Sequence, residues 1–267
     1  MTEESVESIA ILPATAAEHY TDGPFIVAVR TREEFLHWLT DAGSEAEALE
    51  VLGLLSDSEA WGPAAQGRVP LPVDVVVSDP AKEFSALYRL VDVSLARPVR
   101  ITIPAGRPGF MKAVKLAAAL RFPVRLLPEQ PDAEALAELM EAAHFYLHDP
   151  MVEAPIEFFH SVLGNFRGFG TGTLWSFLEQ DPAFNSRRDA TGRPLQEPDF
   201  VETHLAHLHQ SGAECGPCPW RPVCAGYFKW PDSHYDCAGV KQLFNVLQKA
   251  ADEIAQDLSE AEIFTTP

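Results

Sequence analysis

The chain has 267 residues, a formal net charge of −19 and a sequence pI near 4.8. This length can bury a substantial core without disulfides, and the negative charge would on average repel phosphate backbones and anionic membranes. We therefore predict no nucleic-acid partner and no membrane association. The N-terminal "MTEESVESIAILPATAAEHY" has acids where a secretory signal has Lys or Arg, and no stretch approaches the ~20 apolar residues of a membrane span. These features predict a protein of a reducing cytoplasm.

The first half of the chain alternates short β-branched runs with helical patterns, which is typical of a parallel sheet covered by helices. The predicted strands are 24–30, 73–79, 99–104 and 123–131. The predicted helices are 31–43, 44–57, 81–97 and 107–122, with a Pro/Gly-rich loop over 61–72. Four such strands would form half of a barrel or a small open sheet.

The second half has a different character, because no segment after residue 131 has the pattern of another buried parallel strand. The predicted helices are 131–149, 154–166, 173–180, 200–212 and 238–258. The polar, breaker-rich segment 181–199 is predicted to be a mobile loop, and the glycine-rich segment 167–172 a helix connector.

The predicted fold is therefore of the α/β class. It is a partial (β/α) barrel or a small open parallel sheet, followed by an irregular helical lobe in which cysteines bind a metal. We predict three regions: an α/β domain of βα repeats over 1–130, a helical connecting region over 131–212, and a cysteine-containing lobe with a C-terminal helix over 213–267.

All four cysteines of the chain lie in "ECGPCPWRPVCAGYFKWPDSHYDC", residues 214–237, with the spacing C-x2-C-x5-C-x12-C. Four thiolates can surround one tetrahedral ion or occupy the corners of a cubane cluster. A structural Zn²⁺ site commonly has two short C-x2-C-like pairs, whereas the later spacings here are five and twelve. The spacing predicts metal binding and leaves zinc and an iron–sulfur cluster open, with two disulfides a distant third in a reducing compartment.

The run "CGPCPWRPVCAGY", followed by a further Cys and by "VKQLF", resembles the C-terminal SPASM domain of radical S-adenosylmethionine enzymes that modify peptides. The resemblance covers about residues 212–250 and implies that Cys215, Cys218, Cys224 and Cys237 are the complete ligand set of that domain's outer auxiliary [4Fe–4S] cluster. Phe228 stands where the family has a ligand of the inner cluster. The family's radical-generating C-x3-C-x2-C motif is absent as well.

The resemblance favours one [4Fe–4S] cluster over Zn²⁺ and implies that the chemistry depends on another subunit. The predicted function is an iron–sulfur accessory subunit of a peptide or natural-product maturation system, such as that of ribosomally made peptides. It would relay electrons or present a substrate to a modifying enzyme, itself a radical enzyme or of another kind, and bind that enzyme, the precursor peptide or both. No catalytic residue is assigned.

Two alternatives stay open. The chain can be an enzyme in its own right, with a structural cluster and polar groups converging around Asp79, Thr102 and Arg125 at the carboxyl ends of the strands. It can also be a zinc-stapled scaffold that binds a partner.

Several other polar residues are expected to have ordinary structural roles. The histidines of "HLAHLH" are expected to be a polar helix side rather than a second metal site, His234 a surface residue, and the carboxylates of Asp79 and Asp92 caps or turn formers. Candidate donors to cluster sulfurs are the backbone N–H groups of Gly216 and Gly226 and the indole N–H of Trp220. The glycines can equally serve in turns, and the Trp ring in packing. The three histidines of "HLAHLH" are His204, His207 and His209.

Overall fold

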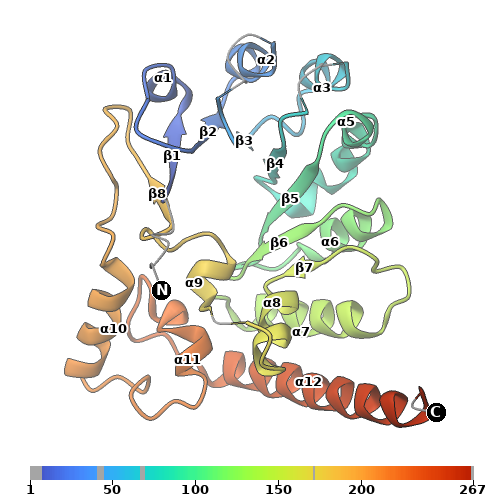
Figure 1. The fold of residues 1–267 in the computed structure, drawn as a ribbon, viewed down its shortest axis with the longest axis vertical. Coiled ribbons are helices and arrows are strands. Elements are labelled where there is room, and N and C mark those ends of the chain that lie inside the picture. The colour runs from blue at the N-terminus through green and yellow to red at the C-terminus, as the bar shows by residue number, and fades with distance from the viewer. Residues whose placement is uncertain (1–7, 41–44, 67–69, 171, 266–267) are drawn as a thin grey trace.

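The computed structural model describes residues 8–40, 45–66, 70–170 and 172–265, so the acidic residues 1–7 and Thr171 of the glycine-rich connector lie outside it. Its centre is one parallel sheet of eight strands in the order β7-β6-β5-β4-β3-β2-β1-β8. Figure 1 shows this sheet curled into an open half-barrel. The strands are β1 (Ile9–Pro13), β2 (Phe25–Val29), β3 (Ala48–Leu52), β4 (Val73–Val76), β5 (Val99–Pro104), β6 (Val124–Leu127), β7 (Ile156–Glu157) and β8 (Asn185–Arg187).

Helices that connect the strands lie outside the curl, and the C-terminal helices lie below it in the view of Figure 1. Aspartates cap the N-termini of two of these helices. Asp57 accepts a hydrogen bond from the backbone N–H of Glu59, and Asp132 accepts one from the backbone N–H of Ala135. The helices of the first half are α1 (Ala14–Ala17), α2 (Arg32–Thr40), α3 (Ser58–Ala64), α4 (Pro80–Glu83), the 3-10 helix η1 (Phe84–Leu90), α5 (Val91–Ala96) and α6 (Met111–Ala119). Those of the second half are α7 (Ala133–His148), α8 (Phe159–Phe166), α9 (Leu174–Phe177), α10 (Phe200–Gln210), α11 (Arg221–Cys224), the 3-10 helix η2 (Tyr227–Lys229) and α12 (Ala238–Thr265).

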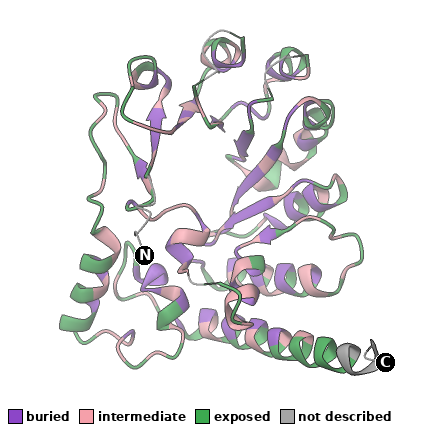
Figure 2. Cartoon of the chain, in the orientation of Figure 1, coloured by how far each residue is buried: buried purple, intermediate pink, exposed green. Residues whose placement is uncertain are grey.

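The two faces of the sheet differ in chemistry because side chains alternate along each strand. On β5, the buried Ile101 and Ile103 belong to the hydrophobic core under the outer helices, whereas Arg100 and Thr102 belong to the other face. Figure 2 shows the strands as largely buried and the helices as exposed on their outer sides. The apolar core therefore lies between sheet and helices, and the inside of the half-barrel is left to polar side chains.

Four strands and most helices were predicted correctly, but the helix over 44–57 was wrong, because Ala48–Leu52 forms β3 between β2 and β4. The loop over 61–72 was wrong in part, since α3 runs through Pro63 to Ala64.

The expectation that no parallel strand follows residue 131 was also wrong. β7 pairs with β6, and β8 pairs with β1, so both edges of the sheet come from the second half of the chain. β8 lies inside the segment predicted to be a mobile loop. The α/β class and the half-barrel are confirmed, with eight strands instead of four. None of the helices in the described residues is long and apolar enough to cross a bilayer.

Candidate functional site

The four cysteines lie around one cavity near the start of α12. Their thiols are free, with Cys215 and Cys237 buried and Cys218 and Cys224 partly buried. Within the described part of the chain, no three His, Cys, Asp or Glu side chains are arranged to hold a single metal ion. The four cysteines thus border a shared space. The other lining residues are Glu214, Trp220, Arg221, Gly226, Lys229, Val240, Lys241 and Phe244.

Tight turns bring the four thiols together. The helix α10 ends at Gln210, and Gly212, with a φ of 72°, turns the chain after it. The N–H of Cys218 then donates to the carbonyl of Cys215 at 3.3 Å. Cys224 is the last residue of α11, and Cys237 immediately precedes α12. The chain turns after Cys224 through two left-handed residues, Ala225 at φ 45° and Gly226 at φ 75°.

The turn after Cys224 gives its sulfur a polar backbone environment. Burial raises the pKa of Cys224 to about 11, while the backbone N–H groups of Phe228, Tyr227 and Gly226 favour the thiolate and act in the opposite direction. Gly226, a predicted candidate donor to a cluster sulfur, is among these groups, and its role toward a cluster stays a prediction. Gly216 instead donates its N–H to the carbonyl of Ala213.

A group of charged residues borders the cysteine cavity. The buried Lys229 pairs with Glu214 at 2.9 Å, and Lys241 pairs with the other oxygen of the same carboxylate. These two ammonium groups lower the pKa of Glu214 to about 2, the hydrogen bond from Lys241 first and that from Lys229 second. Burial raises the pKa of Cys237 to about 12, against the positive charge of Lys229.

The donor set fits a thiolate-bound metal group. Buried thiols with raised pKa values stay protonated on their own and release their protons when a metal replaces them. Four sulfurs around one cavity, two neighbouring ammonium groups and backbone N–H groups near Cys224 suit an anionic cluster with thiolate ligands.

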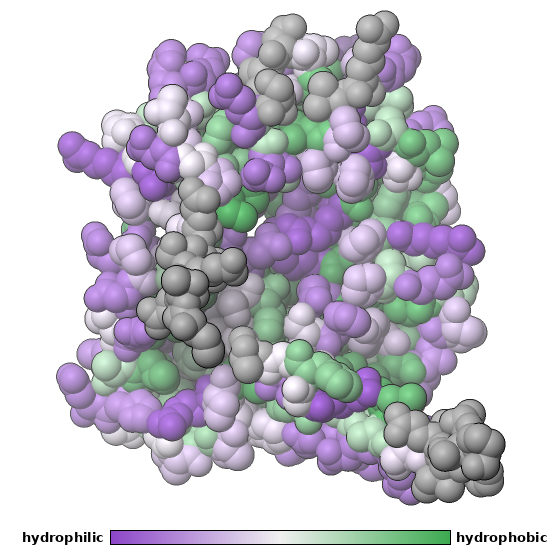
Figure 3. Space-filling view, in the orientation of Figure 1, coloured by the Kyte–Doolittle hydropathy of each residue, from purple (hydrophilic) through white to green (hydrophobic). Residues whose placement is uncertain are grey.

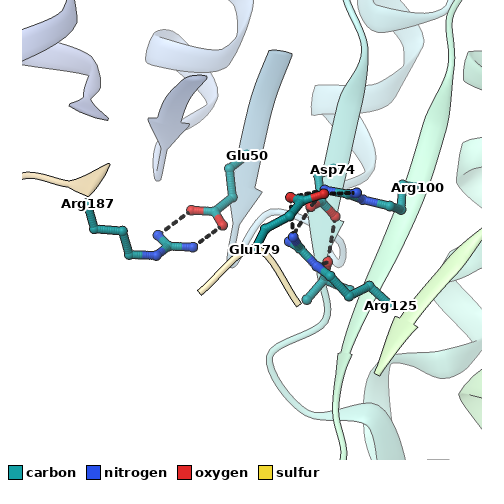
Figure 4. Close-up of polar contacts among 7 residues, drawn as sticks. Glu50, Asp74, Arg100, Arg125, Glu179 and Arg187 are labelled. Atoms are coloured by element: carbon teal, nitrogen blue, oxygen red, sulfur yellow. Dashed lines mark hydrogen bonds and ion pairs between the residues drawn. The ribbon is translucent and has the colours of Figure 1, made fainter. Parts of the chain in front are cut away.

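A second polar centre lies inside the half-barrel, where charged residues of neighbouring strands form ion pairs (Figure 4). Asp74 of β4 contacts Arg100 of β5 at 2.8 Å and Arg125 of β6 at 2.5 Å. The hydroxyl of Thr102 donates to Asp74 at 2.7 Å and accepts from Nε of Arg125 at 3.1 Å. The strand register explains the grouping, because Asp74 is opposite Arg100 and Thr102 is opposite Arg125.

Glu179, which follows α9, completes this network from outside the sheet. Its carboxylate contacts Arg100 at 2.5 Å and also accepts a hydrogen bond from Arg125. Burial opposes ionisation of Glu179, but the hydrogen bond from Arg100 and the charges of Arg125 and Arg100 outweigh it and lower its pKa. Glu179 is therefore held as a carboxylate.

A separate ion pair joins the far edge of the sheet to its middle. Both oxygens of the buried Glu50 on β3 accept hydrogen bonds from Arg187 on β8, at 2.5 and 2.8 Å. This hydrogen-bonded pairing is the first cause of the raised pKa of Arg187. Three carboxylates and three guanidinium groups thus balance inside the half-barrel.

A cavity of about 510 Å³ opens at the carboxyl ends of the strands. In Figure 3, hydrophilic side chains gather in a hollow at the centre of the face shown. Parallel sheets commonly bind ligands at this edge, because the loops there converge. The lining residues are Gly106, Arg107, Glu129, Gln130, Trp175, Glu179, Gln180, Pro182, Asn185, Arg187, Gln196, Tyr227, Trp230 and Pro231.

One segment of the chain, residues 224–231, contributes lining residues both to this cavity and to the cysteine site. The Tyr227 hydroxyl donates to Gln180 at 2.8 Å, and the Trp175 indole donates to the carbonyl of Ala225 at 3.1 Å. Gln130, in the loop after β6, donates to the carbonyl of Phe228 at 3.0 Å. The segment that curls around Cys224 is therefore tied by three hydrogen bonds to the α9 region and to the loop after β6.

The remaining predicted candidates lie outside these two centres or have structural contacts. His204 is buried, with Nε2 at 3.3 Å from the carbonyl of Gly226, and His209 contacts Arg221. His234 is exposed, as expected. The Trp220 ring packs against Phe166 and Phe244.

The predicted convergence of Asp79, Thr102 and Arg125 holds for the last two residues only. Asp79 starts α4 and pairs with Lys82 at 2.6 Å, whereas Asp74 is the carboxylate that meets Thr102 and Arg125. Asp92 lies exposed in the first turn of α5.

Sequence reasoning missed most of the half-barrel network, although a signal was present. Each of four neighbouring strands has one charged residue within an otherwise apolar run. In a parallel sheet buried on both faces, such a charge needs a partner on the next strand. The residues missed were Glu50, Asp74, Arg100, Glu179 and Arg187. Comparisons of the chain with models of protein families, with curated proteins and with solved structures found no match.

Proposed function

We propose that this protein is an iron–sulfur accessory subunit that carries one [4Fe–4S] cluster on Cys215, Cys218, Cys224 and Cys237. It serves a cytoplasmic system that matures a peptide or other natural product, next to a modifying enzyme. The observation that carries the proposal is that all four cysteines of the chain line one cavity, beside the ammonium groups of Lys229 and Lys241.

The cluster would supply one-electron transfer, since four thiolate ligands leave no iron open for a substrate. The chain's own residues set the surroundings of the sulfurs. Lys229 and Lys241 place positive charge beside the cavity, and the backbone N–H groups after Cys224 favour its thiolate. Both features stabilise the negative charge that the cluster gains on reduction, and so would raise the reduction potential of the cluster.

The same lobe suits substrate presentation. Tyr227 and Trp230 belong to the cysteine lobe and also line the half-barrel cavity, so a molecule bound there would lie next to the segment that curls around Cys224. The partner enzyme would then receive electrons or substrate from a lobe whose position is fixed by hydrogen bonds to the half-barrel.

An independent enzyme is the second candidate, favoured by the cavity of about 510 Å³ at the carboxyl ends of the strands. In that case the cluster would be a structural staple. Turnover of a small molecule by the isolated protein, unchanged when the cluster stays oxidised, would favour this candidate over the accessory subunit.

The first test is to purify the protein without oxygen and to measure iron, sulfide and zinc together with the EPR spectrum after reduction. About four irons and four sulfides per chain are expected, with a signal from the reduced cluster. One zinc and no sulfide would refute the proposal and leave a zinc-stapled scaffold.

The role of the cluster is tested with Cys224→Ala in the complex with the co-purifying enzyme. Loss of product with the complex intact supports electron relay, whereas full activity after loss of the cluster contradicts it. His234→Ala is the matched control, because this exposed side chain lies in the same lobe outside the cysteine cavity.

A further inference from the structure

The half-barrel cavity has the size and position of a small-molecule site. Its volume of about 510 Å³ falls within the roughly 300–1,000 Å³ typical of such sites. Arg107 follows β5, Glu129 follows β6, and Arg187 ends β8 on the opposite side, so three separate segments of the chain bring charged side chains to one space.

The charges around this cavity are balanced in number, and two of them lack partners. Arg187 and Glu179 are engaged in the ion pairs inside the half-barrel. The side chains of Arg107 and Glu129 form no hydrogen bond or ion pair with another residue that the structure describes. One free positive and one free negative group therefore remain available to a ligand.

The carboxylate of Glu129 lies against bare backbone at the rim. A Cβ added to Gly106 would come within 2.9 Å of Oε2 of Glu129, so the absence of a side chain at 106 makes room for the carboxylate. This arrangement places an anionic group and Arg107, the residue after Gly106, on the same side of the cavity.

Two residues that line the half-barrel cavity have an unusual backbone conformation. Glu129 has φ 49° and Glu179 has φ 56°, both in the left-handed region that residues other than glycine rarely adopt. Such conformations cost about 1–3 kcal/mol and cluster at functional sites. Both strained glutamates line this cavity.

The rest of the lining suits an amphiphilic molecule. Side-chain amides of Asn185 and Gln196 provide donors and acceptors, and aromatic rings of Trp175, Tyr227 and Trp230 provide apolar surface. Arg107 and Glu129 are both exposed to solvent, and a purely anionic or purely cationic ligand would pair with only one of them.

We propose that the half-barrel cavity binds a zwitterion of the α-amino-acid class with an aromatic or apolar side chain. Arg107 receives the carboxylate, Glu129 receives the ammonium group, and the aromatic rings receive the side chain. The inference extends the proposed function by naming the class of small molecule that the subunit would hold. Binding at this cavity is measured separately from metal content, so either proposal can fail alone.

The test is calorimetric titration of the full-length protein, purified without oxygen, with three related compounds. L-phenylalanine carries both charges, N-acetyl-L-phenylalanine only the carboxylate, and L-phenylalaninamide only the ammonium group. We expect L-phenylalanine to bind, and each derivative to bind about tenfold or more weakly, because a charged hydrogen bond is lost in each case. Absence of binding by L-phenylalanine, or equal affinity for all three compounds, would overturn the proposal.

Two substitutions assign the charges. Arg107→Gln is expected to abolish the advantage of L-phenylalanine over the amide, and Glu129→Gln its advantage over the N-acetyl compound. The matched controls are Arg121→Gln and Glu153→Gln, which remove an exposed ion pair elsewhere and should leave all affinities unchanged. Unaltered discrimination by both cavity variants, with melting temperatures like those of the controls, would refute the assignment.

Discussion

The hydroxyl of Tyr227 donates a hydrogen bond of 2.8 Å to the side-chain oxygen of Gln180, across the boundary between the cysteine lobe and the half-barrel. Tyr227 is buried, and its backbone N–H is one of the groups that favour the thiolate of Cys224. One residue therefore contributes to both centres, its phenol to the cavity and its backbone to the cysteine site.

Tyr227→Phe should lower the free energy of unfolding by about 1–2 kcal/mol, because the oxygen of Gln180 loses its donor in a partly buried place. Urea unfolding measures the change, and a double-mutant cycle with Gln180→Leu isolates the pair. Tyr88→Phe is the control, since Tyr88 is 62% exposed and should change stability little. Additive effects in the cycle would show that the two side chains do not interact in solution.

Arg125→Met should lower the free energy of unfolding by about 3–5 kcal/mol. The side chain of Arg125 is 6% exposed and pairs with two carboxylates, so its loss leaves an excess of buried negative charge. Lys115→Met, which removes an exposed pair with Glu141, should cost only about 0–1 kcal/mol. Equal losses in the two variants would contradict the buried network.

Acid should destabilise the protein through Glu179. Its pKa in the folded state is lowered from the ordinary 4.5, so its contribution to stability is complete above pH 4.5 and is lost as the pH falls through the folded pKa. The difference in unfolding free energy between the wild type and Glu179→Gln should therefore be largest at neutral pH and shrink in acid. Glu141→Gln, at an exposed ion pair, should show a much smaller dependence. A difference that stays constant down to pH values below the folded pKa would refute this account.

Under the proposal that the four cysteines hold a cluster, Gly226→Ala should reduce the iron bound per chain and destabilise the lobe. An added Cβ would lie 2.7 Å from Cδ1 of Leu208, in a segment whose N–H groups favour the Cys224 thiolate. Gly53→Ala is a matched control, because Gly53 has φ 74° against 75° for Gly226 but no neighbour within 4 Å of the added carbon. The control should show only the cost of the backbone conformation, about 1–2 kcal/mol, with full iron content. Equal iron content in both variants would show that the close approach is not needed for the site.

The sequence was sufficient for those strands whose apolar, β-branched runs are long enough to show burial on both faces, such as Val99–Pro104. It failed for β3, because Ala, Leu and Glu in 44–57 favour a helix locally, while pairing with two neighbours imposes a strand. It failed for β8 because three residues, Asn185–Arg187, have no apolar pattern of their own.

The cysteine site could be predicted from the sequence, but the charged network inside the half-barrel could not. The spacing of the cysteines identified the four thiols that line one cavity, and their role as ligands remains a prediction. The half-barrel network could not be read from spacing, since Glu50 and Arg187 are 137 residues apart and meet only when both edges of the sheet are in place. Long-range ion pairs of this kind depend on topology.

That separation constrains the order in which the protein can form during synthesis. Strands β1 to β6 come from a continuous part of the chain. The outer edge of β1 stays unpaired until Asn185–Arg187 has been synthesised. Until Arg187 has left the ribosome, Glu50 has no cation to neutralise its carboxylate inside the sheet. A nascent chain that ends before residue 185 therefore keeps this region open to water and to chaperones, and the half-barrel closes around its charges only after the second half of the chain has been made.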